Sequence, residues 1–204
     1  MKKRKKFYPA KGGFLFTALF LLGFLVGMFL PNLAWRLNWK KNTLTSYYLL
    51  SFLATESIVG KEYFLTVLST RGSWFLFCSL CGFSIFGLPL AIVWIMGMGI
   101  TVGAVLTMSI LQFGFAGGLL GLGMLLPHYI FYFPASFAQS VLMGRQSGKI
   151  WKGPSQSSGS IREAAGLWWP SGLTAALLWS GGILAESFLN PLVIKKILET
   201  MKFF

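Results

Sequence analysis

Few side chains in this sequence of 204 residues could carry out acid–base chemistry. There are five glutamates, no aspartate and one histidine, His128, which follows Pro127 in an apolar run. An ionisable residue inside a membrane is either functional or a neutral group bonded to a backbone carbonyl that a proline has freed. We favour the second interpretation for His128. For Glu186, near the end of the last apolar run, we expect contact with the interface or a neighbouring helix, with a coupling-ion role as the alternative.

The other reactive side chains lack the partners that catalysis needs. The sequence contains no P-loop and no His-Glu-x-x-His zinc motif. Ser84 follows Gly82 but lacks the second glycine of a nucleophile elbow, and Cys78 and Cys81 form a Cys-x-x-Cys pair without a strand–helix–strand context. We therefore predict no catalytic residue, no metal site, no cofactor and no enzymatic activity. An intramembrane hydrolase that uses Ser84 or His128 is the least favoured alternative.

The composition is typical of a membrane protein. Charged residues make up 11% of the chain and hydrophobic residues 55%, whereas soluble domains carry about 25% charged residues. The net charge of +13 could suit nucleic-acid binding, but the basic residues flank apolar runs, as the positive-inside rule predicts. We expect membrane lipids as partners and no nucleic acid.

The hydropathy pattern predicts an all-α fold, a polytopic integral membrane bundle of about five transmembrane helices forming a single domain. Residues 14–34 form an uncharged run that is long for a signal peptide, so we interpret it as the first span. Residues 73–144 carry no charge and are long enough for about three spans. We expect turns at Phe86-Gly87-Leu88-Pro89 and Gln112-Phe113-Gly114. A re-entrant hairpin in place of two spans is the alternative.

The placement of the charges predicts the topology of the chain in the membrane. The basic tail 1–13 and the basic loop 145–166 should both be cytoplasmic, which requires an even number of spans between them. A last span, 167–189, begins with Trp168, Trp169 and Pro170 and places the tail 190–204 outside.

One sizeable segment, 35–71, is expected outside the membrane as two short amphipathic helices on its outer surface. This segment is rich in aromatic residues. They are either contacts to a partner or anchors at the lipid interface, and the two interpretations weigh equally. The residues concerned are Tyr47, Tyr48, Tyr63 and Phe64.

Pairs of glycines four residues apart indicate helices that pack closely. They predict a compact bundle, and they leave open a face for a homo-oligomer or hetero-oligomer. The pairs are Gly23 with Gly27, Gly99 with Gly103, Gly114 with Gly118, and Gly117 with Gly121.

Three blocks of the sequence resemble the stage II sporulation protein M family. The run from Cys81 to Pro89 is similar to its glycine-, serine- and proline-containing stretch, Met98 to Gly103 to its paired-glycine segment, and Leu125 to Ala135 to its Leu-Pro and Pro-Ala signature. The motif and helix-break positions that carry the resemblance are Gly82, Gly87, Pro89, Gly99, Gly103, Pro127, His128 and Pro134. Tyr129 and Tyr132 stand where the wider family often has glycine and glutamate, which favours the sporulation branch.

The resemblance implies a membrane scaffold of endospore formation. It would recruit and anchor septal peptidoglycan-degrading enzymes, stage II sporulation proteins D and P, in the mother-cell membrane during engulfment. The chemistry would then belong to those partners. The alternative is a permease or accessory subunit of a membrane transporter.

Overall fold

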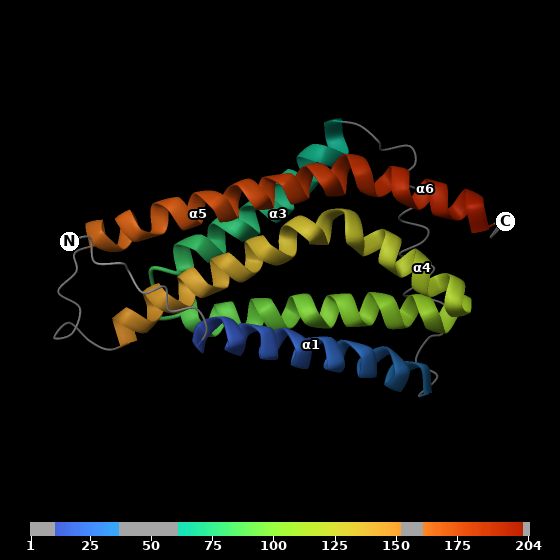
Figure 1. Ribbon diagram of the computed structural model, residues 1–204, viewed down its shortest axis with the longest axis horizontal. Coiled ribbons are helices and arrows are strands. Elements are labelled where there is room, and N and C mark those ends of the chain that lie inside the picture. The colour runs from blue at the N-terminus through green and yellow to red at the C-terminus, as the bar shows by residue number, and fades with distance from the viewer. Residues whose placement is uncertain (1–10, 37–60, 152–160, 202–204) are drawn as a thin grey trace, which may run out of the picture.

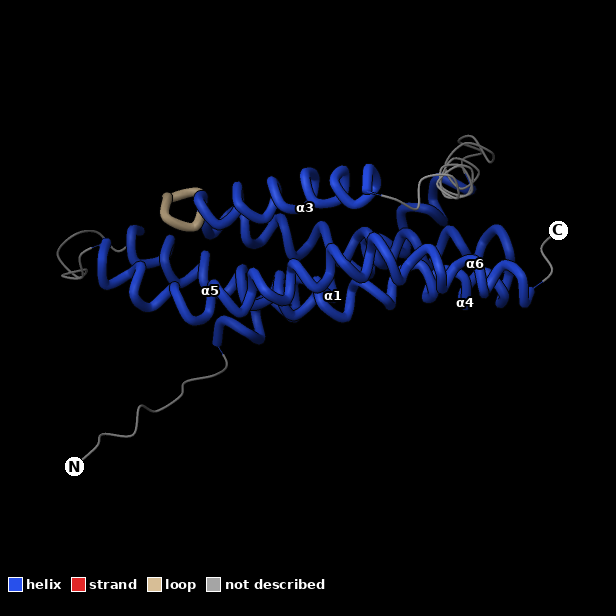
Figure 2. Tube along the Cα trace, turned by 90° about the horizontal axis from the view of Figure 1, so that it is seen from above, coloured by secondary structure: helices blue, strands red, loops and turns tan. Residues whose placement is uncertain are grey.

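The computed structural model describes residues 11–36, 61–151 and 161–201, which are helical apart from one short turn (Figures 1 and 2). The elements in chain order are α1 (Lys11–Arg36), α3 (Lys61–Cys81), α4 (Gly87–Trp151), α5 (Ile161–Leu184), the π-helical turn η2 (Ala185–Leu189) and α6 (Asn190–Met201). No strand occurs in the described residues.

Helix α4 is two antiparallel helices joined at a sharp reversal. Its first arm is Gly87–Leu111 and its second arm is Gly114–Gly148, each long enough to span a membrane. The chain reverses at Gly114, which has φ 64° and ψ −144°. Figure 1 shows the two arms returning side by side.

Five helical segments in the described residues are long and apolar enough to cross a membrane, which confirms the predicted helical membrane bundle. Besides the two arms of α4 they are Gly13–Leu33, Lys61–Cys81 and Pro170–Ile197. The start of α1, the turn after α3, the end of α4 and the start of α5 lie at one end of the bundle (Figure 1). Four spans therefore separate α1's start from the loop before α5.

Two helices differ in extent from the sequence-based expectation. Helix α3 begins at Lys61 rather than after Arg71, so it takes in the last part of the segment 35–71. The final span runs on from Pro170 to Ile197 through η2 into α6 rather than ending near residue 189. The first difference follows from the pairing of Arg71 with Glu186 described below, because paired charges can lie inside a bundle.

The turn between α3 and α4 is fixed from two sides. Ser84 Oγ donates to the Cys81 carbonyl at 2.8 Å and accepts the backbone N–H of Phe86 at 3.2 Å. Ser147 Oγ and Trp151 Nε1, at the end of α4, donate to the Ile85 carbonyl at 3.1 and 2.9 Å. The hydroxyl of Ser84 therefore shapes a turn.

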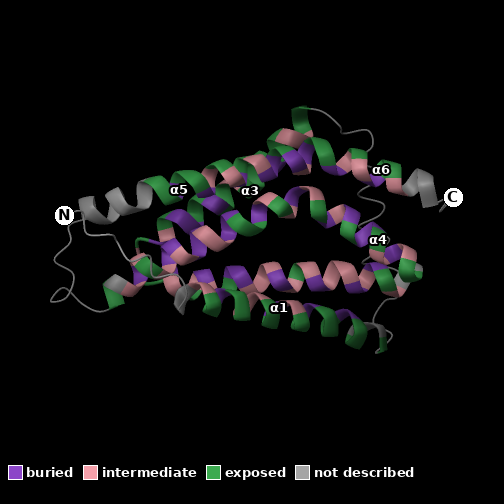
Figure 3. Ribbon diagram, viewed as in Figure 1, coloured by how far each residue is buried: buried purple, intermediate pink, exposed green. Residues whose placement is uncertain are grey.

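Helix α1 packs against the first arm of α4 through glycines on both helices. A Cβ at Gly23 would collide with the Met96 carbonyl, and one at Gly99 with the Phe20 carbonyl. Gly27 and Gly103 stand in the same relation one turn further along, against the carbonyls of Ile100 and Phe24. The predicted small-residue packing is therefore intramolecular for these two pairs. The opposite face of α1 is exposed (Figure 3), as expected of a helix that meets lipid.

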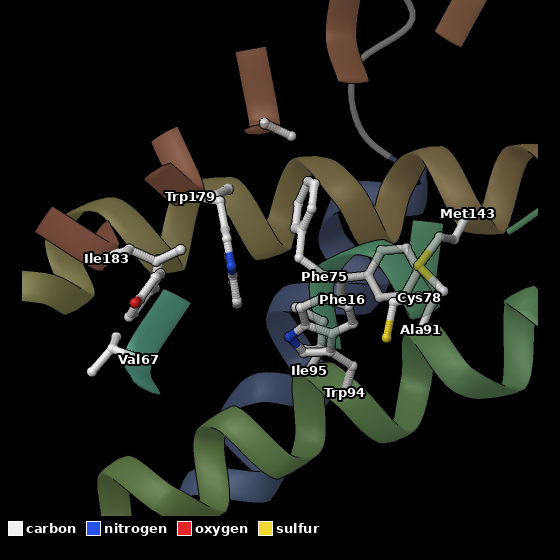
Figure 4. Packing of buried hydrophobic residues seen from close by; sticks show 13 residues of the cluster. Phe16, Val67, Phe75, Cys78, Ala91, Trp94, Ile95, Met143, Trp179 and Ile183 are labelled. Carbon is white, nitrogen blue, oxygen red and sulfur yellow. The ribbon is translucent and has the colours of Figure 1, made fainter. Parts of the chain in front are cut away.

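An aromatic cluster joins α3, α4 and α5 at the centre of the bundle (Figure 4). The ring of Trp179 stacks on Phe75 with centroids 5.3 Å apart and meets Trp94 edge-on at 5.5 Å. It also contacts the ring of Tyr132 at 4.5 Å. Close packing of this kind holds helices together within lipid, where the hydrophobic effect does not.

The backbone at Gly114 leads to a first expected result. A side chain is strained in this region of φ and ψ, although a Cβ at Gly114 would meet nothing within 4 Å. We expect Gly114→Ala to lower the free energy of unfolding by about 1–3 kcal/mol, measured by titrating the purified chain with SDS. Gly148→Ala, also free of contacts but helical, is the control and should be neutral or stabilising. An equal loss in both variants would contradict the role of the backbone at Gly114.

Candidate functional site

An ion pair lies about halfway along the bundle, between α3 and η2. Arg71 Nη2 donates to Glu186 Oε1 at 2.9 Å and Arg71 Nε to Glu186 Oε2 at 3.2 Å. The Glu186 side chain is 12% exposed and that of Arg71 47% exposed. The two parallel hydrogen bonds fix the carboxylate in one orientation.

Two aromatic side chains complete this site. Tyr132 Oη, from the second arm of α4, donates to Glu186 Oε2 at 2.7 Å, and the Arg71 guanidinium stands over the Tyr132 ring at 5.7 Å. Trp179 Nε1, from α5, donates to the Arg71 backbone carbonyl at 3.1 Å. We call Arg71, Tyr132, Trp179 and Glu186 the ion-pair cluster; it joins α3, α4, α5 and η2.

The glutamate of the cluster lies in a π-helical turn. The Asn190 N–H bonds to the Ala185 carbonyl, one residue further back than in an α-helix. Pro191 follows and has no N–H to donate. A π-turn changes the direction in which the following side chains point, and such turns are frequent at functional sites.

His128 lies one turn from Tyr132 on α4. It is 6% exposed, and its ring contacts Tyr129 and Tyr132 with centroids 5.0 and 5.6 Å apart. Its Nδ1 has no hydrogen-bond partner among the described residues. The structure thus places His128 beside the ion-pair cluster.

The glycines and prolines of the predicted motif serve helix geometry. Gly82 and Gly87 approach each other across the turn, since a Cβ at Gly87 would stand 2.9 Å from the Gly82 Cα. Pro89 lies in the first turn of α4, where a proline is tolerated. Helix α4 continues through Pro127 and Pro134, and its second arm bends in its yellow part in Figure 1, as helices often do at proline.

The aromatic residues considered for partner docking divide into two groups. Phe64 stacks on Phe188 of η2 with centroids 6.0 Å apart, and Tyr63 packs against the buried hydrophobic core of the bundle. Both are half-buried. Tyr47 and Tyr48 lie outside the described residues.

The described residues gather no metal-binding group of three or more His, Cys, Asp or Glu side chains. Cys78 and Cys81 are both free thiols, and Cys78 is buried in the hydrophobic core of the bundle. The ion-pair cluster brings the two opposite charges of Arg71 and Glu186 together inside the bundle. It can hold helices together, and its acceptors and donors can hold water or a proton.

Sequence reasoning placed Arg71 at the edge of an outer segment and did not connect it with Glu186. One signal was available, because each is an isolated charge of opposite sign beside an apolar run, and charges within membranes usually pair. The hydrogen bond of Tyr132 and the π-turn had no signal in the sequence.

Comparison with known proteins adds one finding. A family model described as SpoIIM, stage II sporulation protein M, matches residues 16–191 and so includes the whole ion-pair cluster. No curated protein and no solved structure matches the chain.

Proposed function

This chain belongs to the stage II sporulation protein M family, and we propose that it is a membrane scaffold that recruits and anchors septal peptidoglycan-degrading enzymes during engulfment. The family match implies a role in sporulation, and the five apolar helices make the chain a multi-pass membrane protein. By resemblance, the partners are stage II sporulation proteins D and P, and the location is the mother-cell membrane at the septum. We further propose that the chain itself is not an enzyme.

The observation that carries a scaffold rather than a catalyst is the closed hydrogen bonding of the ion-pair cluster. Both carboxylate oxygens of Glu186 accept hydrogen bonds from Arg71, and one also accepts from Tyr132. A carboxylate whose two oxygens are both held by hydrogen bonds from neighbouring helices is suited to join those helices. The same bonds tie three helices together and give the bundle a fixed outer surface.

The outer face of α3 is the surface that we propose for a partner's transmembrane helix. Glu62, Thr66, Ser69 and Ser73 recur at intervals of four, three and four residues, and all four are exposed. This spacing is that of a helix–helix seam, and small hydroxyl residues let helices approach closely in membranes. Figure 2 shows α3 at the edge of the bundle with one side uncovered. We call these four residues the α3 seam.

Replacing the three hydroxyl residues of the α3 seam with leucine should weaken capture of the partner enzymes. We expect the triple variant Thr66→Leu, Ser69→Leu and Ser73→Leu to retain about tenfold less hydrolase on co-purification from sporulating cells, because the seam becomes too bulky for close approach. The measurement is quantitative mass spectrometry of the retained proteins.

The control for this experiment changes hydroxyl residues on other exposed faces. Thr17, Thr101 and Ser180 are exposed and, like Thr66, bond to the carbonyl four residues back. Their triple leucine variant should retain the hydrolases in full. Equal capture of the hydrolases by both triple variants would exclude the α3 seam as the surface that binds them. Normal arrival of the hydrolases at the septum in cells lacking this chain would exclude the scaffold itself.

The second candidate function is a permease or an accessory subunit of a membrane transporter. A row of buried polar side chains along the second arm of α4 favours it, because transport requires polar groups inside the bundle.

A further inference from the structure

The second arm of α4 carries a row of polar residues on its buried face. Apart from the adjacent pair Gln139 and Ser140, their spacing of three, four or seven residues places them on one side of the helix. All are less than 9% exposed, and four of them are completely buried. We call His128, Tyr132, Ser136, Gln139, Ser140 and Ser147 the α4 polar row.

The α4 polar row is as long as a membrane is thick. From His128 to Ser147 the helix rises about 28 Å at 1.5 Å per residue. The hydrocarbon core of a bilayer is about 30 Å thick. The row begins beside the ion-pair cluster, about halfway along the bundle, and extends to the end of the bundle at which α4 ends.

Polar atoms without a protein partner occur along most of this row. They are His128 Nδ1, Ser136 Oγ, Gln139 Oε1 and Ser140 Oγ in the row and Gln146 Oε1 beside it, none of which finds a hydrogen-bond partner among the described residues. Ser136, Gln139 and Ser140 are 0% exposed. Buried polar atoms are almost always satisfied, and where protein does not satisfy them, internal water does.

The apolar residue Met143 interrupts the row between Ser140 and Ser147. Helix α3 supplies polar groups at this level. Gln139 Nε2 donates to Ser79 Oγ at 2.7 Å. At Gly82, the position that a Cβ would take is 3.1 Å from both the Ser79 carbonyl and Gln146 Oε1. The absence of a side chain at Gly82 therefore lets these polar groups approach one another.

The opposite end of the row meets further unpartnered groups on η2 and α6. Ser187 Oγ and Asn190 Oδ1 are buried and without partners among the described residues. Gly182 faces the Tyr132 ring and Gly123 faces Ile197. The second arm of α4 and the segment from α5 to α6 therefore run antiparallel. Ser187 and Asn190 lie between these two contacts, at about the level of His128.

We propose that water held along the α4 polar row conducts protons across the bundle. Each water or hydroxyl in the chain accepts a proton on one side as it releases another on the other side. No covalent bond of the protein changes, one proton leaves for each that enters, and the transmembrane proton gradient drives the movement. The polar side chains hold and orient the water.

The ion-pair cluster decides whether a proton can pass the His128 end of the row. An unpaired arginine beside a pore repels protons and other cations. Here Glu186 cancels the charge of Arg71 through two hydrogen bonds, and Tyr132 of the row bonds to the same carboxylate. The pair therefore leaves this end of the path without a net positive charge.

Proton flux through the purified full chain tests the proposal. The chain is placed in liposomes containing a pH-sensitive dye, and a potassium diffusion potential set with valinomycin drives protons inward. We expect flux at least about tenfold above protein-free liposomes, and a loss of about tenfold in Gln139→Met, which keeps the volume but removes the polar group. The control Ser180→Ala removes an exposed hydroxyl outside the row and should conduct like the unaltered chain.

Two outcomes would overturn the proposal. One is flux no greater than that of protein-free liposomes, and the other is equal flux in Gln139→Met and the unaltered chain. If Gln139→Met fails to fold, as shown by gel filtration and circular dichroism, Ser136→Ala combined with Ser140→Ala takes its place. That double variant removes two hydroxyls and adds no volume, and its flux should fall in the same direction.

Charge variants of the ion-pair cluster provide a second, independent readout. Glu186→Gln leaves Arg71 uncompensated and should abolish flux. Adding Arg71→Gln removes that charge and should restore conduction to within about threefold of the unaltered chain. Flux that persists in Glu186→Gln, or that stays absent in the folded double variant, would refute the role given to the pair.

Discussion

Glu186→Gln is expected to destabilise the bundle by about 3 kcal/mol, since removing one partner of a buried ion pair typically costs about 3–5 kcal/mol. The lower end applies because the Arg71 side chain is 47% exposed. The substitution leaves the guanidinium without its counter-charge, and one of the two oxygens that accept from Arg71 becomes an NH2 group, which cannot accept a hydrogen bond. SDS titration of the purified chain, followed by far-ultraviolet circular dichroism, measures the loss.

The control for this prediction removes both charges. Arg71→Gln combined with Glu186→Gln leaves no unpaired charge, and the two amides can still bond to each other. We expect the loss in the double variant to be about 2 kcal/mol smaller than the sum of the losses in Glu186→Gln and Arg71→Gln measured alone, a coupling energy within the range for residues in direct contact. Losses that simply add in the double variant would show that Arg71 and Glu186 do not stabilise the fold as a pair.

Gly99→Ala is expected to lower the free energy of unfolding by about 2–3 kcal/mol, the upper part of the usual range for overpacking. The new Cβ would collide with the Phe20 carbonyl and stand 2.8 Å from the Phe24 backbone nitrogen. Backbone atoms of α1 cannot rotate away as a flexible side chain can, so α1 and α4 must separate. The same SDS titration measures the effect.

Gly97 provides a matched control on the same helix. It lies two residues from Gly99 in the first arm of α4, and a Cβ there would meet nothing within 4 Å. Gly97→Ala should be neutral or stabilise the protein by up to about 1 kcal/mol through helix propensity. A similar loss at both positions would mean that the close approach of α1 and α4 contributes little to stability.

The helical class and the number of spans could be predicted because both depend on local properties of the sequence. A stretch of about 20 apolar residues must form a helix in lipid, where every backbone polar group needs an internal partner. The reversal at Gly114 coincides with an expected turn for a similar reason. Only glycine readily takes the backbone angles found there.

The site could be predicted only in part. His128 and Glu186 stood out as isolated ionisable residues in apolar runs, and the structure places both at the centre of the bundle. Arg71 was assigned to the outer segment because a single arginine ends an uncharged stretch, and the hydropathy pattern does not reveal a counter-charge far along the chain. The glycines at 99 and 103 indicated close packing without identifying α1 as the neighbour.

The sequence by itself determined that this chain is a bundle of five apolar helices with glycine-rich contacts and little charge in its spans. Only the tertiary structure decided which side chains meet. Arg71 and Glu186 are 115 residues apart, and their pairing depends on α3 lying beside η2. The α4 polar row likewise becomes a buried row only when α3 and α5 cover that face. Local patterns fix helices because their hydrogen bonds are local, whereas a site is fixed by how those helices pack.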